Sequence, residues 1–403
     1  MAKLVKFASR MGWRFTVITA DEPGDIIARD PSLIEEIPQS TKIIRVPFSL
    51  LPNVKKRSAS LMSKSSFWKR YLSAFFYLPD SRKKWLAFAW KSIEQELKTE
   101  KYDVVLLSIP PYSLSFLVRR IQEQFRLPVI LDMRDPWSLN PYKIYPTPLH
   151  RYLDQRLELK AVSPVKFGIH AYRRALDFYR RKIPDFAQAK WMVIPNGFDA
   201  DDFKELADEA PTAHKETFDI AFSGTIYSHI NHPTPLFKAM AEFKAENPVQ
   251  GAKVRFVFTG KAHIDLKKLA AKFGLENQLI LHGYLPHKDS LRVLKQADAL
   301  CFILDDRCKR SVFTVGGKVY EYLALKKPIL ALAPEEGEAA DVIRQTASGV
   351  VISPQKIKEI SATLSAWASG NIPQFSFNGI ENYRREKQAK EFVDFFEQAI
   401  REN

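Results

Sequence analysis

Short apolar runs and helix-length amphipathic segments alternate along almost the whole chain. The runs are rich in β-branched and aromatic residues, which predicts strands, and the segments between them repeat apolar residues at helical spacing. Strands that alternate with helices form parallel sheets covered by helices on both faces, so the pattern predicts doubly wound α/β domains. The predicted strands cover residues 15–19, 43–47, 103–107, 129–132 and 191–194 in the first half and 220–223, 254–258, 279–281, 299–303 and 329–332 in the second.

An acidic stretch without a predicted strand, from Asp199 to Thr212, separates the two halves. Such a stretch is typical of an interdomain linker. We therefore expect a first domain at 1–205 and a second at 206–377. The last segment, 378–403, carries apolar residues spaced for one face of a helix. Because that face needs burial, we expect the helix to pack back on the first domain.

Composition limits the class of protein. The chain has 403 residues with 46% hydrophobic content, enough for two buried cores. No window approaches the about 18 to 20 uninterrupted apolar residues of a membrane span, and the first residues lack a secretory apolar region. These observations predict a cytoplasmic protein. Cys301 lies in an apolar run and Cys308 is the only other cysteine, which argues against a disulfide framework or a zinc site.

The charge balance predicts an anionic partner. The formal net charge is +15 and the isoelectric point is near 9.5, which favours nucleotide diphosphates, acidic lipid headgroups or nucleic acid. No module for nucleic-acid recognition is legible, because paired Cys/His spacing, an aromatic RNA-binding octamer and a basic helix followed by heptads are all missing from the sequence. Nucleic acid therefore stays a secondary interpretation.

Cations and aromatic residues interleave from Lys55 to Tyr77, outside any predicted strand. Segments of this kind lie in a membrane interface, with rings among the headgroups and cations on acidic lipid. They also occur as insertions whose aromatic residues pack on their own domain. The sequence leaves both interpretations open, and an acidic membrane surface is accordingly a candidate partner.

Glycine turns follow several predicted strands of the second half. Ser223-Gly224-Thr225, Gly260-Lys261 and Gly283-Tyr284-Leu285 each come at or just after the end of a strand. Glycine lets backbone N–H groups approach a phosphate, and a helix N-terminus adds partial positive charge. Because ligands of open α/β sheets bind beyond the carboxyl ends of the strands, these turns should share one rim.

A second glycine-rich segment, Thr314-Val315-Gly316-Gly317, is predicted to open a helix with Lys318 in its first turn. The helix dipole disfavours a cation at that position unless an anion is bound, so the segment predicts an anion site. Glu321 follows one turn later, where a carboxylate can accept hydrogen bonds from ribose hydroxyls. Composition alone favours a solvated helix residue at Glu321.

These motifs together resemble glycosyltransferase family 4 and its relatives. The resemblance is carried by Pro195-Asn196-Gly197-Phe198-Asp199 at the close of the first half, by the Ser223-Gly224-Thr225 turn and by Glu321 before Lys327-Pro328-Ile329-Leu330. It covers nearly the whole chain and is strongest from Lys190 to Pro354. It implies the glycosyltransferase-B fold, in which two Rossmann-like domains face each other across a cleft.

The resemblance also implies roles for individual residues. Donor binding falls to Ser223, Gly224, Thr225, Lys261, Tyr284, Leu285, Thr314, Val315, Gly316, Gly317 and Glu321. Catalysis falls to Lys318, at the donor phosphate, and to Arg134 and Asp135, at the strand end where many relatives present a histidine. An internal Arg134–Asp135 ion pair is the rival interpretation. No metal and no cofactor are expected.

The sequence departs from the family pattern at three places. Phe313 stands where the first glutamate of the Glu-x7-Glu motif is expected, so backbone N–H groups of Thr314 to Gly317 would take over donor contacts. His229 and His232 stand near the position of a Lys-Gly pair, and helix-start or solvent roles are expected for them. Residues 1–11 match the first helix of the family, with Gly12 after it, so the first strand of the sheet is not represented; its loss would leave a gap or force rearrangement.

By resemblance, the function is transfer of a sugar from a UDP- or GDP-type donor to a glycan or lipid-linked acceptor, with retention and without a metal. The setting would be surface polysaccharide or glycan biosynthesis, with a peripheral position at the inner face of the membrane. Two rivals stay open: a sugar-nucleotide epimerase of the same fold, and a binding or scaffold protein without catalysis.

Overall fold

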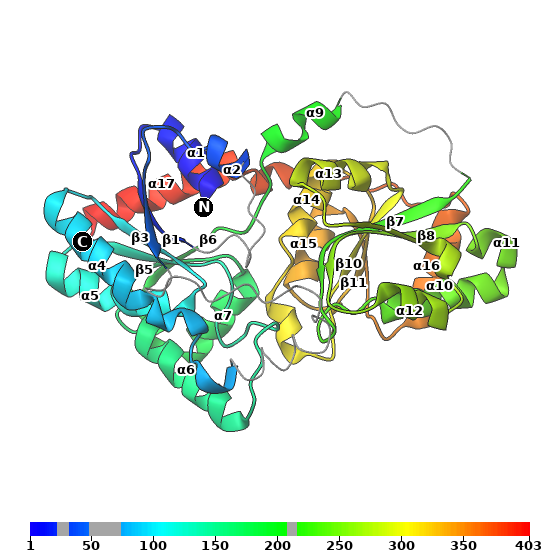
Figure 1. Ribbon diagram of the computed structural model, residues 1–403, viewed down its shortest axis with the longest axis horizontal. Helices are drawn as coiled ribbons and strands as arrows, with labels where there is room; N and C mark the ends of the chain where they lie inside the picture. Colours follow the sequence, from blue (N-terminus) through cyan, green and yellow to red (C-terminus); the bar gives the residue numbers. More distant parts are fainter. Residues whose placement is uncertain (22–31, 48–73, 208–215) are drawn as a thin grey trace. The chain divides into compact units, whose positions relative to one another are not determined.

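The computed structural model describes residues 1–21, 32–47, 74–207 and 216–403. The chain divides into two compact units, the first made of Met1–Asn196 with Arg385–Asn403 and the second of Gly197–Arg384 (Figure 1). Each unit is built from parallel strands and helices that alternate along the chain. The predicted fold class is thereby confirmed for each unit.

The second unit contains one six-stranded parallel sheet in the order β12-β11-β10-β7-β8-β9. Its strands are β7 (Phe218–Ile226), β8 (Val254–Ala262), β9 (Leu279–Gly283), β10 (Ala299–Ile303), β11 (Ile329–Leu332) and β12 (Gly349–Ile352). All five predicted strands of this half are confirmed. The short edge strand β12 was not predicted.

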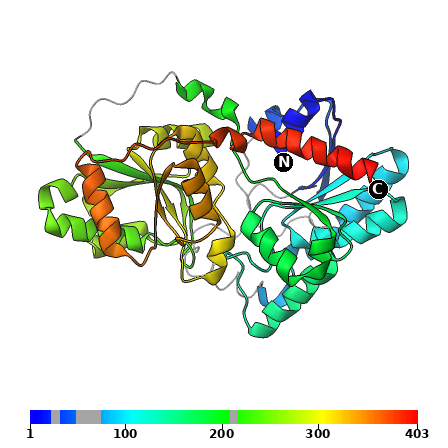
Figure 2. The same cartoon turned by 180° about the vertical axis from the view of Figure 1, so that it is seen from behind.

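Helices cover both faces of this sheet in both views (Figures 1 and 2). The α-helices are α9 (Lys204–Ala207), α10 (Thr234–Glu246), α11 (Pro248–Gly251), α12 (Leu266–Lys272), α13 (His287–Gln296), α14 (Lys318–Leu325), α15 (Glu338–Thr346) and α16 (Ile357–Ala368). Buried apolar side chains of α10, α16 and the sheet form one core. Within it, the rings of Phe237 and Phe256 meet edge to face at 5.3 Å, an arrangement that favours aromatic pairs.

The first unit contains two parallel sheets among its described residues. One pairs β1 (Thr16–Asp21) with β2 (Lys42–Pro47), and the other has the order β3 (Val105–Ile109), β4 (Val129–Met133), β5 (Phe167–His170) and β6 (Lys190–Val193). The sequence pattern did not predict β5, because this strand has only four residues and is as short as the turns around it. The α-helices of this unit are α1 (Ala2–Arg10), α2 (Ser32–Glu35), α4 (Leu86–Thr99), α5 (Leu117–Phe125), α6 (Pro148–Val162), α7 (Arg173–Lys182), α8 (Pro184–Gln188) and α17 (Arg385–Arg401).

Helix α17 belongs to the first unit. Its apolar face, which includes Phe392 and Phe396, shares a core with Leu4 and Phe7 of α1 and with side chains of β4 and β5. The two helices lie side by side in both views (Figure 2). The ring of Trp13, just after α1, meets Phe396 at 5.3 Å. Burial of this apolar face fixes the end of the chain on the first unit.

Two sequence features fall partly outside the described residues. Of the cation- and ring-rich segment from Lys55 to Tyr77, the structure describes only the part from residue 74 onward, and of the acidic stretch it describes residues up to 207. Within the described residues, no helix combines the length and the apolar character that a membrane crossing requires. Cys301 is buried as a free thiol in β10.

Candidate functional site

The topology of the second sheet predicts where a ligand binds. The chain passes from β7 to β8 and β9 on one side and then crosses to β10 on the other, so the strand order reverses between β7 and β10. Ligands of open α/β sheets bind beyond the carboxyl ends of the strands at such a switch point. At this place Gly224 lies in the last part of β7, and Lys318 begins the helix that follows β10.

The segment Ser223-Gly224-Thr225 is part of β7 rather than a turn after it, which corrects the expectation from sequence. Gly224 pairs with Gly260 of β8, and Thr225 pairs with Lys261. Both glycines have positive φ, and a Cβ at Gly260 would lie 1.9 Å from the carbonyl oxygen of Gly224. The two glycines therefore allow the strands to stay paired beyond the point where other residues would separate them.

Ser223 anchors the end of β7. Its backbone N–H donates to Oη of Tyr322 at 3.1 Å, and its hydroxyl lies 2.9 Å from that of Ser290. Tyr322 belongs to α14 and Ser290 to α13. Ser223 is buried, and its backbone N–H and its hydroxyl both have hydrogen-bond partners. It therefore has a packing role, in which it holds α13 and α14 against β7.

The glycine-rich segment after β10 is shaped by close packing. A Cβ at Gly316 would lie 2.8 Å from the ring of Phe302, whereas one at Gly317 would meet nothing within 4 Å. Thr314 and Val315 are buried. Only the exposed Gly317 and the half-buried Gly316 therefore present backbone to a ligand at the start of α14.

Lys318 and Glu321 form the charged centre of the site. Nζ of Lys318 lies 3.0 Å from Oε1 and 2.9 Å from Oε2 of Glu321, as the i, i+3 spacing on one helix face allows. A Cβ at Gly224 would lie 3.9 Å from Cγ of Lys318, so the lysine stem passes the end of β7. The structure thus brings Gly224, Lys318 and Glu321 together.

His287 is a site residue that sequence reasoning missed. It opens α13, and its Nε2 lies 3.3 Å from Oε1 of Glu321. Burial alone would raise the pKa of Glu321, but the hydrogen bond with His287 and the charge of Lys318 hold that pKa below its ordinary value. The same hydrogen bond raises the pKa of His287, and the charge of Asp202 acts in the same direction. Only the packing of α13 on α14 creates this contact, which no spacing in the sequence reveals.

We expect His287→Gln to remove a pH-dependent part of the stability of the second unit. Because the folded pKa of His287 is raised, its stabilising contribution is fully present below the unfolded value of 6.5 and is lost as the pH rises through the folded pKa. The substitution should therefore destabilise the protein at about pH 6 and have little effect at about pH 9, as measured by urea denaturation. A difference in stability that is the same at both pH values would contradict this account.

Lys261 and Tyr284 lie beside each other at the ends of β8 and β9. Nζ of Lys261 is 5.4 Å from the centre of the Tyr284 ring, within the range of a cation–π contact. Tyr284 is 57% exposed, and Leu285 beside it is half-buried. An exposed ring and an exposed cation at one rim offer a stacking surface and a positive charge to a nucleotide.

The segment after β7 is braced by a side chain that the sequence did not single out. Oδ1 of Asn231 accepts the N–H of Tyr227 at 2.7 Å, and Nδ2 donates to the carbonyl of Thr225 at 2.8 Å. His232 has its Nδ1 2.7 Å from the hydroxyl of Thr234, at the start of α10. Burial lowers the pKa of His232. His232 therefore has the helix-start role that was expected for it.

Arg134, the first catalytic candidate of the first unit, pairs with Asp132 at 3.2 Å, not with Asp135 as the rival interpretation held. Its guanidinium also donates to the carbonyl oxygens of Ile194 and Pro195, both at 2.9 Å. It thereby ties the end of β4 to the segment after β6. Asp135 is half-buried, and burial raises the pKa of its carboxyl group.

His170, at the end of β5, was also missed. It is fully buried, and its Nδ1 accepts the N–H of Tyr172 at 2.9 Å. Burial and the charge of Arg134 lower its pKa to about 3, so the ring is neutral near pH 7. Because β5 was not predicted as a strand, nothing in the local pattern indicated that this histidine lies beside the end of β4.

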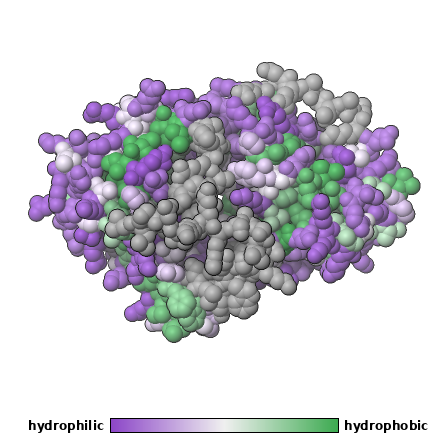
Figure 3. All heavy atoms as spheres, in the orientation of Figure 1, coloured by the Kyte–Doolittle hydropathy of each residue, from purple (hydrophilic) through white to green (hydrophobic). Residues whose placement is uncertain are grey.

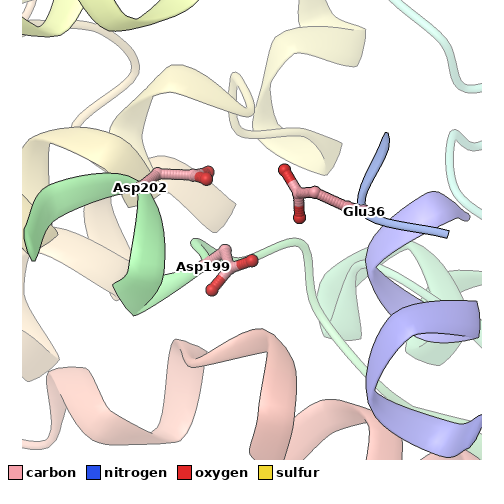
Figure 4. A group of neighbouring side chains, drawn as sticks. All are labelled: Glu36, Asp199 and Asp202. Atoms are coloured by element: carbon pink, nitrogen blue, oxygen red, sulfur yellow. The ribbon is translucent and has the colours of Figure 1, made fainter. Parts of the chain in front are cut away.

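Figure 4 shows two carboxylates of the second unit, Asp199 and Asp202, and one of the first, Glu36. Asp199 is buried, and its Oδ1 accepts the backbone N–H of Asp201 at 3.0 Å. Glu36 pairs with Lys3 at 2.6 Å. Asp199 and Glu36 thus each have a partner within their own unit, which accounts for their positions without a ligand.

Comparison with known proteins gives a family match for the second unit. Residues 203–386 match the family of glycosyl transferases group 1. No curated protein matches the chain. Three solved structures with similar folds are a sucrose-phosphate synthase from Thermosynechococcus elongatus, Alr3699/HepE from Anabaena in complex with UDP, and an alpha,alpha-trehalose-phosphate synthase (UDP-forming) from Burkholderia vietnamiensis.

These three likenesses extend over both units. The TM-scores are 0.59, 0.56 and 0.62 and the sequence identities 13%, 12% and 10%, in the order given. The alignments cover 98%, 96% and 97% of this chain and 91%, 100% and 100% of the other chains. At such identities they show the fold, while the family match concerns the second unit. Residues 203–386 are therefore similar to the group 1 glycosyl transferases, and the chain has the glycosyltransferase-B fold of the compared structures.

Proposed function

We propose that the chain transfers a sugar from a nucleotide-sugar donor, and that the donor binds at the carboxyl edge of the second sheet. The observation that carries this proposal is the Lys318–Glu321 pair, which lies beside Gly224 at the switch point of the sheet. Without an anion, a lysine in the first turn of a helix is unfavourable for the helix dipole. Glu321 partly supplies that anion in the structure, and a bound diphosphate would supply it at the helix start itself.

When a donor binds, Lys318 and Glu321 can contact different parts of it. Lys318 and the N–H groups of Gly316 and Gly317 would meet the diphosphate, as helix N-termini do. The carboxylate of Glu321 would accept hydrogen bonds from the ribose hydroxyls. His287 would keep that carboxylate ionised and oriented while Lys318 turns to the phosphate, because it holds Glu321 from a second helix.

The remaining rim offers a place for the base. Tyr284 and Leu285 follow β9 and would contact the base, with Lys261 adding charge near the diphosphate. Alr3699/HepE was solved in complex with UDP, and the trehalose-phosphate synthase is described as UDP-forming. Both descriptions support a UDP-type donor over a GDP-type donor. Thr314 and Val315 are buried. They would contribute to donor binding by holding the backbone of the glycine-rich segment 314–317 in position.

The reaction itself is proposed as retaining and independent of a metal. Lys318, Lys261 and the N–H groups would stabilise the charge that develops on the leaving diphosphate. Asp135 and Arg134 of the first unit are the further catalytic candidates. The acceptor would be a glycan or a lipid-linked glycan of surface polysaccharide assembly, and the protein would then act peripherally at the inner face of a membrane.

Incubation with a panel of UDP-, GDP- and ADP-sugars tests the reaction. A retaining, metal-independent transferase should still transfer or hydrolyse the sugar in the presence of EDTA. Its product should have the same anomeric configuration as the donor. Release of a 2-epimerised sugar would favour the epimerase, and binding without turnover the scaffold protein.

Glu321→Gln tests the donor site directly. Hydrogen bonds to a charged group are worth about 1.5 to 3 kcal/mol, so the substitution should weaken nucleotide binding about tenfold or more. Glu359→Gln is a matched control, because Glu359 is an exposed glutamate in the first turn of α16 with a lysine, Lys356, three residues before it. Calorimetric titration of UDP and GDP into both variants measures the effect. Equal affinities would refute the role of Glu321.

A further inference from the structure

Helix α6 of the first unit is oriented with its acidic residues inward. Asp154 and Glu158, one turn apart, are its only carboxylates, and both are buried. Asp154 accepts hydrogen bonds from Nε1 of Trp137 at 3.0 Å and from the hydroxyl of Tyr145 at 2.6 Å. A helix on the surface of a protein normally turns its charged residues to water and its leucines to the core, so the outer face of α6 requires an explanation.

The outer face of α6 combines apolar and cationic side chains. Leu149 is 60% exposed, Tyr152 55% and Leu153 43%. Arg156 and Lys160 are exposed beside them. With both carboxylates buried, this face carries no exposed acid. The described residues give neither Arg156 nor Lys160 a salt bridge.

A short helical stretch at residues 74–76 extends this surface. Phe75 and Phe76 are 46% and 72% exposed. The backbone carbonyl of Phe75 lies 3.1 Å from Nε2 of His150 on α6, and the two rings are 4.8 Å apart. This stretch and α6 together line an open groove of about 810 Å³, with Lys83 at its side. Figure 3 shows hydrophobic residues gathered in the lowest part of the view, where Figure 1 draws α6.

We propose that this surface docks on a bilayer that contains anionic phospholipid. The α6 surface, as we call it, consists of Phe75, Phe76, Lys83, Leu149, Tyr152, Leu153, Arg156 and Lys160. Aromatic rings and leucines lie in the boundary between headgroups and acyl chains, while cations beside them meet the lipid phosphates. The surface carries both kinds of side chain in one place.

Charge favours this occupant over a second copy of the chain. Two copies joined through the α6 surface would bring cations against cations, with no exposed carboxylate of α6 to balance them. An anionic bilayer supplies the opposite charge over the whole area, and the net charge of +15 strengthens the attraction. Lipid binding is independent of the proposed reaction, since it needs neither donor nor acceptor.

Co-sedimentation with vesicles tests the proposal on the full-length protein. Wild type should sediment with vesicles that contain phosphatidylglycerol, much less with phosphatidylcholine alone, and should be released as salt is added. Leu153→Glu should abolish binding. Arg156→Ala and Lys160→Ala should each weaken it about fivefold, the contribution expected of one cation near an anionic surface.

Matched controls come from the second unit. Val249→Glu introduces the same charge at a residue that is 71% exposed, and Lys268→Ala removes an exposed cation of α12. Both should leave binding unchanged. The altered residues of the α6 surface are exposed, so circular dichroism and thermal unfolding should match the wild type in every variant.

Three results would overturn the proposal. One is wild-type protein that does not bind anionic vesicles. The second is binding that survives Leu153→Glu but is lost when Lys55, Lys56 and Arg57 are replaced, which would assign the membrane contact to that segment. The third is a dimer in light scattering that Leu153→Glu dissociates, which would make the α6 surface an interface between copies.

Discussion

Lys318→Ala should lower the turnover of a nucleotide-sugar donor about 100- to 1000-fold, the loss typical when one donor that stabilises a developing negative charge is removed. Nζ of Lys318 lies within 3.0 Å of Glu321 and its stem passes Gly224, so the substitution removes the positive charge from the start of α14. Steady-state and single-turnover kinetics measure the loss.

Two further variants separate catalysis from structure. Lys318→Arg keeps the charge and should recover part of the rate. Lys356→Ala removes a lysine that pairs with Glu335 and Glu359 near the start of α16, and it should leave the rate unchanged. Because the Lys318 side chain is 36% exposed, its pair with Glu321 should contribute no more than about 1 kcal/mol to stability. Turnover that survives Lys318→Ala would remove Lys318 from the catalytic machinery.

Asp154→Ala should lower the free energy of unfolding of the first unit by about 3 to 5 kcal/mol, because a buried ion pair loses one partner. Asp154 has no exposed surface, and Nζ of Lys143 lies 2.6 Å from its Oδ2. Trp137 and Tyr145 would lose their acceptor at the same time. Chemical denaturation followed by tryptophan fluorescence measures the change.

Asp289→Ala is the control for this substitution. Asp289 pairs with Arg292 at 2.7 Å on an exposed face of α13, and exposed pairs contribute about 0 to 1 kcal/mol. If both substitutions had the same small effect, Asp154 would not anchor α6. The α6 surface would then lose its structural explanation, since this anchor keeps Leu149 and Leu153 outward.

The hydrophobic pattern of the sequence determined the class of fold and most strands, because alternation of short apolar runs with amphipathic segments is a local property. It also placed Gly317, Lys318 and Glu321 at one helix start, and it predicted an amphipathic helix at 378–403, where α17 now packs. The short strands β5 and β12 were missed, because four residues give too little pattern and their pairing partners lie far along the chain.

Tertiary structure alone decided the contacts between elements. It extended β7 through Thr225, because Gly224 and Gly260 let two backbones approach. It gave Arg134 a partner two residues away in place of its neighbour Asp135. It brought His287 to Glu321 from another helix. Leu149 and Leu153 of α6 are exposed, while Asp154 has buried partners in the segment before the helix, a pairing of side chains that the spacing within α6 does not encode.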